Sequence, residues 1–302
     1  MKLKHEVKNI FLKNMVVSSD YQFENVNDYY SFLVKNKPLV LKNNHVHDNV
    51  CDHRFNLVHP IGYGNKDWKC PYHNSDQSHL KKYNTFKYND IFFIGDKLYE
   101  SSIKELFNKQ KLNLSKCIYT KTHDINANWK LIIENAIESY HVPFVHEDIP
   151  EPFLTKDRYP KSYRVGIHSY DYITLKTTRF KKYFDEWYWR NYFIWPNAWL
   201  SQSGHYVLLA IILPISYKKS KVSFELFVQD NDWHPKILKY VNGTTTDVVK
   251  KLFKQDIPFI ESCQTGLESN THKEYKLSDN EPRVKWFYET YSEYKYKLDN
   301  KI

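Results

Sequence analysis

Two kinds of hydrophobic pattern divide the chain. From Pro38 to about residue 98, short β-branched and aromatic runs such as PLVLKNN and IFFIG alternate with glycine, proline and Asn-Asp pairs. This texture predicts strands and turns. Residues 1–36 mix apolar and charged positions and predict a helical or irregular lead-in. KELFNKQKL, residues 104–112, predicts a short helix at a domain boundary.

The pattern lengthens from Asn128 onward. In NWKLIIENAIESYH the apolar residues recur at spacings of three and four, which predicts an amphipathic helix that ends before Pro143. Residues 163–229 alternate or run apolar and predict antiparallel strands, and a last long helix is predicted over 245–268. The fold class is therefore α+β. We expect a small all-β domain (37–115) followed by an α+β domain (116–302). The lead-in (1–36) is expected to pack on the α+β domain.

Composition and charge narrow the function classes. Hydrophobic residues make up 41% of the 302 residues and charged residues 26%, as in ordinary globular proteins. The longest apolar run, VLLAIILP, is much shorter than the ~20 residues of a membrane span, and the first residues contain no apolar signal segment. Four cysteines without such a segment argue for a cytoplasmic location and against a disulfide framework. The net charge of +9 comes from dispersed lysines, which argues against nucleic acid as a partner.

Two loops of the β-rich segment each offer one thiol and one imidazole. Cys51 and His53 form a Cys-x-His pair, and after sixteen intervening residues Cys70 and His73 form a Cys-x-x-His pair. Two thiolates and two imidazoles can hold one tetrahedral zinc ion. They can also hold a [2Fe–2S] cluster in which one iron takes the thiolates and the other takes the imidazoles. Common zinc fingers keep like ligands together, whereas each loop here carries a mixed pair.

A second group of candidate ligands follows the helix that begins at Asn128. Glu134, Glu138 and His141 are spaced four and three apart and so share one face of that helix. Pro143 breaks the helix, which lets His146 turn back toward His141.

Asp256 supplies a third ligand for these two histidines. It falls on the apolar stripe of the C-terminal helix, where a carboxylate is costly unless it is paired or bound to a metal. Two histidines and one carboxylate form the facial triad of non-haem Fe(II) oxygenases, with open positions for dioxygen.

In both motifs the chain resembles the catalytic α subunits of the Rieske non-haem iron oxygenases. The resemblance rests on CDHR and CPYH, on NWKLIIENAIESYHVPFVHED, and then on PNAWL, ILPI and QDIPFIESCQTGLES in order. It runs from about residue 38 to 290. The family commonly continues the second loop with Gly-Trp, where this chain has Asn74-Ser75. The departure concerns how this loop packs and docks, and it leaves the four ligands intact.

The resemblance implies a Rieske [2Fe–2S] domain followed by a helix-grip (START-like) catalytic domain, with a curved antiparallel sheet and a long C-terminal helix. It implies a cluster held by Cys51, His53, Cys70 and His73, and Fe(II) held by His141, His146 and Asp256.

Two glutamates also gain roles from the resemblance. Glu138 becomes the bridge that carries an electron from the cluster of one subunit to the iron of its neighbour, and Glu134 lies in a position beside the iron. Such contacts close into a ring, expected to be a homotrimer. Most members carry Asp where this chain has Glu138, and Glu there resembles the branch that acts on choline, glycine betaine and carnitine.

The electrons must come from another protein. No GxGxxG motif is present, so we expect NAD(P)H to act only through a separate ferredoxin or flavin reductase. Dioxygen is the expected co-substrate. Cys117 and Cys263 stand alone and are expected to be buried thiols.

The expected reaction is hydroxylation, or oxidative demethylation or cleavage, of a small organic molecule. Aromatic and polar strand or helix residues are predicted to line its pocket: Tyr140, Phe193, Trp195, Asn197 and Tyr206. An aromatic box suits a quaternary ammonium ion through cation–π attraction, and a flat aromatic substrate of a ring-hydroxylating oxygenase would be held by the same residues. A zinc-stabilised binding module is the rival from another class, but it leaves the second group of ligands unexplained.

Overall fold

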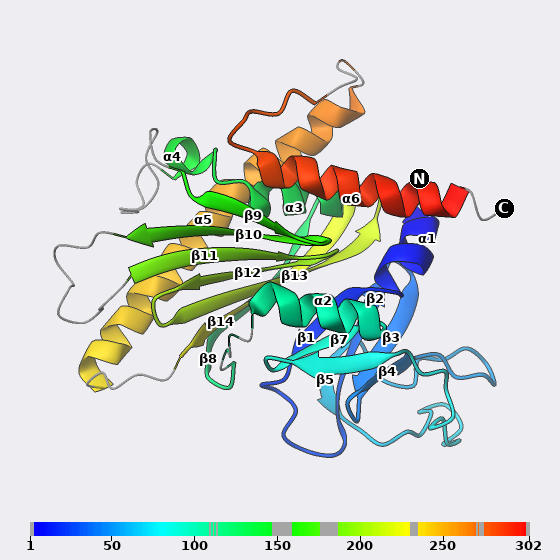
Figure 1. Cartoon of the computed structure of the whole chain (residues 1–302). Coiled ribbons are helices and arrows are strands. Elements are labelled where there is room, and N and C mark those ends of the chain that lie inside the picture. The colour runs from blue at the N-terminus through cyan, green and yellow to red at the C-terminus, as the bar shows by residue number, and fades with distance from the viewer. Residues whose placement is uncertain are drawn as a thin grey trace.

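The computed structural model describes residues 3–108, 110, 112, 114–146, 159–175, 187–229, 235–269, 271 and 275–299. A β-rich N-terminal part precedes a larger part built on one extensive sheet (Figure 1). The N-terminal helical segment lies beside the last helix (Figure 1).

A seven-stranded antiparallel sheet forms the centre of the larger part. Its strands lie in the order β8-β14-β13-β12-β11-β10-β9, so consecutive strands pair from β9 through to β14, and β8 completes the far edge. β13 contacts β1 and β2 of the N-terminal part, whereas β9 and β10 contact α2. The strands are β8 (Cys117–Ile125), β9 (Lys161–Val165), β10 (His168–Leu175), β11 (Trp187–Ile194), β12 (Ala198–Ser203), β13 (Tyr206–Ser216) and β14 (Lys219–Val228).

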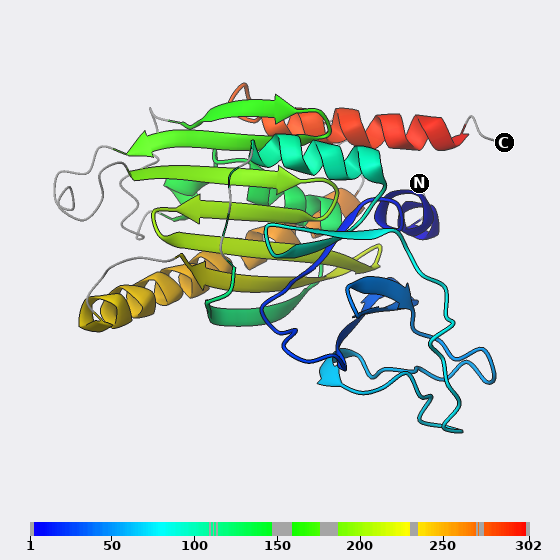
Figure 2. The same ribbon diagram turned by 60° about the horizontal axis from the view of Figure 1, so that its bottom comes forward.

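Helices cover both faces of this sheet. α3 (Trp129–Ile137) and α5 (Pro235–Glu268) lie against one face, and α2 (Lys97–Phe107) lies against the other (Figure 2). α4 (Val142–Val145) follows α3, and α6 (Pro282–Asp299) lies beside β9 and α3. None of the helices in the described part of the chain combines the length and apolar character needed to cross a bilayer.

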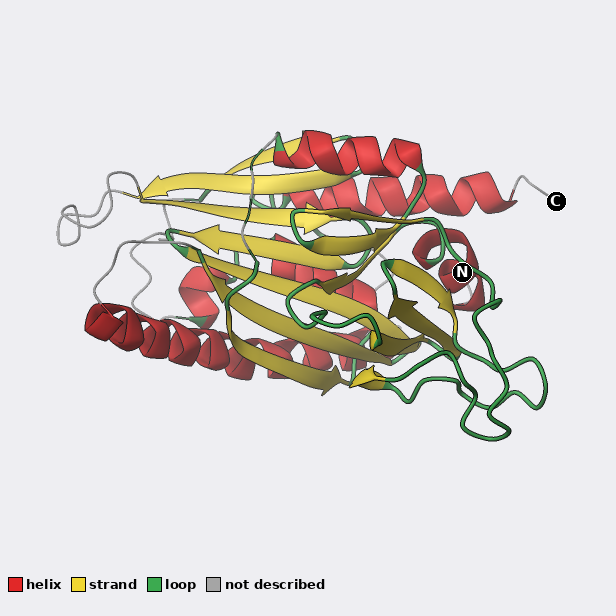
Figure 3. Cartoon of the chain, turned by 90° about the horizontal axis from the view of Figure 1, so that it is seen from below, coloured by secondary structure: helices red, strands yellow, loops and turns green. Residues whose placement is uncertain are grey.

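The N-terminal part holds two small antiparallel sheets. One has the order β1-β7-β6 and the other β4-β3-β2-β5. Long loops between β4 and β6 project from one corner of the molecule (Figure 3). The elements are α1 (Leu3–Glu6), the π-helix η1 (Val7–Phe11), β1 (Met15–Ser19), β2 (Asp28–Val34), β3 (Lys37–Lys42), β4 (His45–Asp48), β5 (Gly62–Asn65), β6 (Thr85–Tyr88) and β7 (Ile91–Ile94).

Several element predictions need correction. The lead-in contains strands β1 and β2, and β2 pairs with both β3 and β5. The helix expected over 104–112 is α2 at 97–107, which starts where the Asp96 side chain accepts a hydrogen bond from the Tyr99 amide at 2.9 Å. α5 begins at Pro235 and continues through Pro258, and α6 was not predicted.

The two lone cysteines also differ from expectation. Cys117 is only partly buried, and Cys263 is exposed on α5. Cys263 was expected to be buried as part of the apolar stripe of α5. The rest of the protein covers only part of this stripe, since Val249, Phe253 and Ile260 are buried and Leu267 is exposed.

Candidate metal centre and its cavity

His141, His146 and Asp256 come together at one point. Their ligand atoms all lie within 4.8 Å of one another, and no other group of three or more such side chains in the described part of the chain does so. Oδ1 of Asp256 lies 3.1 Å from Nε2 of His146 and 3.6 Å from Nε2 of His141. The local chain explains this arrangement, because α3 ends at Ile137 and Pro143 starts the short helix α4 between the two histidines.

The outer nitrogen of each imidazole has an acceptor. Nδ1 of His141 faces Oε1 of Glu138, whose Oε2 also accepts from the His141 backbone amide at 3.0 Å. Nδ1 of His146 lies 2.9 Å from Oε1 of Gln255. Such acceptors favour the tautomer that carries its proton on Nδ1, and in that tautomer Nε2 of each ring is the nitrogen with a lone pair for a metal.

The carboxylate of Asp256 and the two imidazoles together form a group of donor atoms that needs a cation. Oδ1 of Asp256 is buried and has no hydrogen-bond partner. With both Nε2 atoms unprotonated, three electron-rich atoms face one another, which is unfavourable unless a positive ion lies among them. Two imidazoles and one carboxylate are the donor set preferred by non-haem Fe(II), so these residues fit that metal.

The two Cys/His loops have the same backbone design. In each loop the cysteine amide bonds to the carbonyl five residues on, at 2.8 Å for Cys51 and 2.9 Å for Cys70. The residue four positions after each cysteine, Phe55 or Asn74, bonds back to the cysteine carbonyl and has a positive φ of 59° or 57°. The Tyr72 amide lowers the pKa of the Cys70 thiol, as suits a thiolate ligand.

The four side chains pair by type across the two loops. Nδ1 of His53 lies 3.2 Å from Nδ1 of His73, and the Cys51 and Cys70 thiols adjoin each other. Both cysteines are buried and both histidines are exposed. A single tetrahedral zinc ion would hold all four ligand atoms close together, whereas no three of these converge within 4.8 Å. Paired thiols and separately paired imidazoles fit a two-iron cluster.

A cavity of about 150 Å³ adjoins the triad. Aromatic and apolar side chains from β11, β12 and α5 form much of its wall, which suits a small organic molecule. Asn191 donates from Nδ2 to the Ala136 carbonyl at 2.9 Å, while its buried Oδ1 has no hydrogen-bond partner. The wall residues beyond the triad include Trp189, Asn191, Trp199, Ser201, Leu208, Leu252 and Phe253.

Comparison with known proteins fixes the family. The family model "Ring hydroxylating alpha subunit (catalytic domain)" matches residues 114–295, more than half of the chain. The chain belongs to this family. Members of this family are oxygenases, so the protein is an oxidoreductase α subunit.

Individual relatives agree with the family match. The carnitine monooxygenase oxygenase subunit of Escherichia coli K12 is 22% identical over 89% of this chain and 82% of its own. The quaternary ammonium Rieske monooxygenase CntA superposes with a TM-score of 0.75 at 16% identity, over 96% of this chain and 91% of its own. Naphthalene 1,2-dioxygenase from Rhodococcus sp. gives 0.74 at 14% identity, with the same coverages. The mixed α/β fold with large antiparallel sheets is thus that of the Rieske oxygenases.

In this ring-hydroxylating α subunit, the five predicted substrate residues do not line the cavity. Phe193 and Trp195 are buried and pack against Phe287, and Asn197 is fully buried, where it bonds to the Val16 backbone. Two others point elsewhere: the Tyr206 hydroxyl bonds to Asn242, and Tyr140 is partly exposed with its ring against Phe144 and Tyr159.

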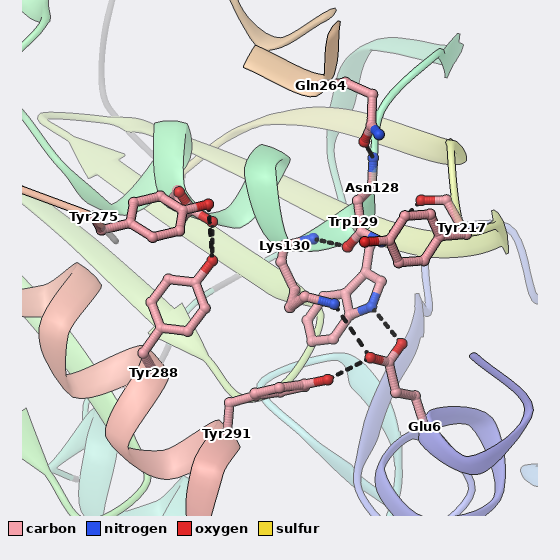
Figure 4. Close-up of polar contacts among 10 residues, drawn as sticks. Glu6, Asn128, Trp129, Lys130, Tyr217, Gln264, Tyr275, Tyr288 and Tyr291 are labelled. Atoms are coloured by element: carbon pink, nitrogen blue, oxygen red, sulfur yellow. Dashed lines mark hydrogen bonds and ion pairs between the residues drawn. The ribbon is translucent and has the colours of Figure 1, made fainter. Parts of the chain in front are cut away.

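Glu134, on α3, has its carboxylate turned toward α6. Its carboxylate accepts a hydrogen bond from the Tyr288 hydroxyl on α6, and the Tyr275 hydroxyl lies 3.5 Å from that of Tyr288. Burial raises the pKa of Glu134 to about 7. Figure 4 shows the tyrosines of α6 reaching α3, with Tyr291 bonded to Glu6 beside Trp129. α3 is therefore held by α6 on one side and by α1 on the other.

Gln255 and a buried ion pair near the site were not predicted from the sequence. Gln255 orients His146, and only its place next to Asp256 could have indicated this. A buried ion pair between Asp171 and Arg283, with a closest approach of 3.0 Å, joins β10 to α6. Asp171 also accepts a hydrogen bond from Ser139, the residue after Glu138, at 3.3 Å.

Proposed function

We propose that this protein is the terminal oxygenase of a multicomponent system that uses dioxygen to hydroxylate or oxidatively cleave a quaternary ammonium compound. The observation that carries the proposal is the buried Oδ1 of Asp256, which faces two Nε2 atoms and has no hydrogen donor. We assign His141, His146 and Asp256 as ligands of Fe(II), and Cys51, His53, Cys70 and His73 as ligands of a Rieske [2Fe–2S] cluster. When bound, the cluster supplies single electrons and the Fe(II) activates dioxygen.

The protein's own residues orient the ligand histidines of the triad and leave the histidines of the Cys/His loops exposed. Glu138 fixes the ring of His141 from its outer side, and Gln255 does the same for His146. The imidazoles of His53 and His73 are exposed on the projecting loops, beside Phe55 and Tyr72, which are 79% and 57% exposed. Exposed ligand imidazoles with apolar neighbours suit contact with another subunit or an electron donor.

We infer that Glu138 bridges the metal sites of neighbouring subunits. It is partly buried at the rim of the cavity, with both carboxylate oxygens turned toward His141. A contact from one subunit's cluster loops to the next subunit's Glu138 is heterologous and closes into a ring, for which we propose a homotrimer. The proposed domains 37–115 and 116–302 hold the cluster ligands and the iron ligands respectively, and β1 and β2 of the lead-in add to the sheets of the first. Electrons come from a separate ferredoxin or flavin reductase.

The substrate class rests on the cavity and on the carnitine-oxidising relatives. Trp189, Trp199 and Phe253 line the space beside the triad, and aromatic rings attract a quaternary ammonium ion by cation–π interaction. Asn191 offers an unpartnered carbonyl oxygen that accepts a hydrogen bond from a hydroxyl group of the substrate. The carnitine monooxygenase subunit and CntA are named for substrates of this class.

Spectroscopy on protein purified without oxygen tests the metal assignments. We expect a dithionite-reducible Rieske signal in electron paramagnetic resonance and about three irons per chain, two from the cluster and one from the triad. Asp256→Asn should keep the cluster signal and lose one iron, whereas Cys70→Ser should lose the cluster signal. A colourless protein with one zinc ion would exclude the oxygenase assignment.

Turnover with a surrogate reductase then tests the substrate class. Carnitine, γ-butyrobetaine and glycine betaine should stimulate oxygen consumption coupled to product. Phe253→Ala should weaken substrate binding while both metals remain. Coupled oxidation of indole or naphthalene, with none of the quaternary amines, would assign an aromatic substrate.

A further inference from the structure

A second cavity lies between the N-terminal part and the large sheet, on the face away from the metal triad. Its volume is about 290 Å³, and it shares no lining residue with the cavity beside the metal centre. Tyr30 of β2 and Tyr63 of β5 form one wall, with stacked rings whose centroids lie 4.4 Å apart. Hydroxyl and apolar side chains from β8, β13 and β14 form the opposite wall: Thr120, Thr122, Leu213, Ile215 and Ser223.

Glu225 of β14 borders this cavity with an unsatisfied carboxyl group. Its side chain is 4% exposed, and its Oε2 has no hydrogen-bond partner. The hydroxyls of Ser19 and Tyr63 lie beside the carboxyl, and the buried Oγ of Ser19 also lacks a partner. Burial raises the pKa of Glu225 to about 7. Such a group is costly in a folded protein unless something binds it.

No described side chain supplies a positive charge to this carboxyl. The groups whose titration it affects are themselves acidic or neutral, namely Tyr21, Tyr30, Tyr63 and Cys117. Lys221, four residues earlier on the same strand, also lines the cavity, but its amine is paired with Asp124 at 3.0 Å. Within the described part of the chain, the cavity therefore combines aromatic walls with an acid that lacks a cation.

We propose that this cavity binds a small primary ammonium ion, with its –NH₃⁺ group at Glu225 and its alkyl part between the tyrosines and the large sheet. An –NH₃⁺ group carries three N–H donors, which match Oε2 of Glu225 and the neighbouring hydroxyl oxygens. A quaternary ammonium ion has no N–H and cannot satisfy Oε2, so this site differs in chemistry from the cavity at the metal triad.

Such a ligand would touch β2 and β5 on one side and β8 and β14 on the other. It would stiffen the junction between the part that carries the Cys/His loops and the part that carries the triad. Its binding requires no metal, so it is measurable on the full chain whether or not the oxygenase assignment holds.

Isothermal titration of the full chain with propylammonium chloride tests the proposal. Wild-type protein should bind propylammonium at least about tenfold more tightly than 1-propanol, which has the same alkyl chain but lacks the charge. Affinity should rise between pH 6 and pH 8, because binding at pH 6 must expel the Glu225 proton. Titrations in buffers of different ionisation enthalpy should show about one proton released at pH 6 and almost none at pH 8.

Glu225→Gln keeps the shape of the side chain and should reduce propylammonium affinity by about tenfold or more, with no proton release. Glu289→Gln, at an exposed carboxylate on α6 that is paired with Arg164, is the matched control and should bind as the wild type does. Equal binding of propylammonium and 1-propanol by the wild type would overturn the proposal without any variant. Unchanged affinity in folded Glu225→Gln, or no heat with propylammonium, would also overturn it and leave an ordered water as the occupant.

Discussion

Gln255 places Oε1 2.9 Å from Nδ1 of His146, one residue before Asp256 on α5. One turn of α5 therefore provides both a proposed metal ligand and the group that orients a second ligand. An acceptor at Nδ1 turns the Nε2 lone pair of His146 toward Oδ1 of Asp256, 3.1 Å away. The geometry of the candidate centre thus depends on Gln255, whose side-chain oxygen faces Nδ1 of His146 and not the ligand nitrogen Nε2.

Removing this acceptor should weaken metal binding. Gln255→Leu keeps the bulk of the side chain but loses the hydrogen bond, so iron affinity at the triad should fall by about 10- to 100-fold. Competition with a chelator, followed by iron analysis, measures this loss, while the cluster signal should persist. Lys254→Gln, at the exposed preceding position of α5, is the control. Iron retention equal to the wild type in Gln255→Leu would show that Gln255 has no orienting role.

Glu138 should control electron delivery without controlling metal content. In Glu138→Gln an amide nitrogen must face either the Nδ1–H or the backbone amide of His141, so one of the two hydrogen bonds is lost. We expect oxidation of the reduced cluster by the iron centre to slow by about 10- to 100-fold with all irons retained. Rapid-mixing spectroscopy follows this step.

Two further variants define the effect at Glu138. Glu138→Asp keeps the charge and should recover part of the rate. Glu268→Gln, at a carboxylate of α5 paired with Lys218 at 2.7 Å, should behave as the wild type. A normal electron-transfer rate in Glu138→Gln would place the bridge elsewhere.

The sequence predicts the triad because helical spacing encodes which side chains share a face. Glu138 and His141 are three apart, Pro143 ends the helical path, and Asp256 is an acid within an apolar stripe. No comparable signal marks Gln255, because a polar residue on a helix is ordinary. α6 was missed for a related reason: its tyrosines and charged residues give a weak apolar pattern, although Phe287 and Val284 are buried.

The substrate cavity shows where strand patterns stop being informative. Phe193 is on the same side of β11 as Trp189 and Asn191, since alternate residues share a face. Only the last two border the cavity, whereas Phe193 packs against Phe287 of α6. The alternation identifies the strand and which side chains share a face. Which of those side chains reach the cavity depends on where α6 packs against the strand, and the strand sequence does not show this.

Glu134 should make stability depend on pH near neutrality. Its pKa of about 7 in the folded protein lies above its ordinary 4.5, so the folded state binds more protons than the unfolded state between these values. Stability should therefore fall as pH rises from about 5 to 8. Glu134→Gln should remove about 2–3 kcal/mol of this dependence between pH 5 and pH 8 in urea unfolding. Identical pH profiles for the two proteins would contradict the raised pKa.

The Tyr288 hydroxyl should hold that pKa down, because it donates a hydrogen bond to the Glu134 carboxylate. Tyr288→Phe should move the titration of the Glu134 carboxyl to higher pH, visible in the infrared band of the protonated acid. Tyr291→Phe is the matched control, since its hydroxyl lies one turn further along α6 and bonds to Glu6. An equal shift in both variants would mean that general packing of α6, rather than this bond, sets the pKa.

The ion pair between Asp171 and Arg283 should be costly to break, because both side chains are only 1% exposed. Arg283→Met leaves the carboxylate of Asp171 buried without its cation and should destabilise the protein by about 3–5 kcal/mol in urea unfolding. Arg164→Met breaks the exposed pair with Glu289 on the same helix and should cost less than about 1 kcal/mol. The double variant Arg283→Met/Asp171→Leu should be more stable than Arg283→Met alone, since no unpaired charge remains. Equal losses for Arg283→Met and Arg164→Met would show that the buried pair does not hold β10 to α6.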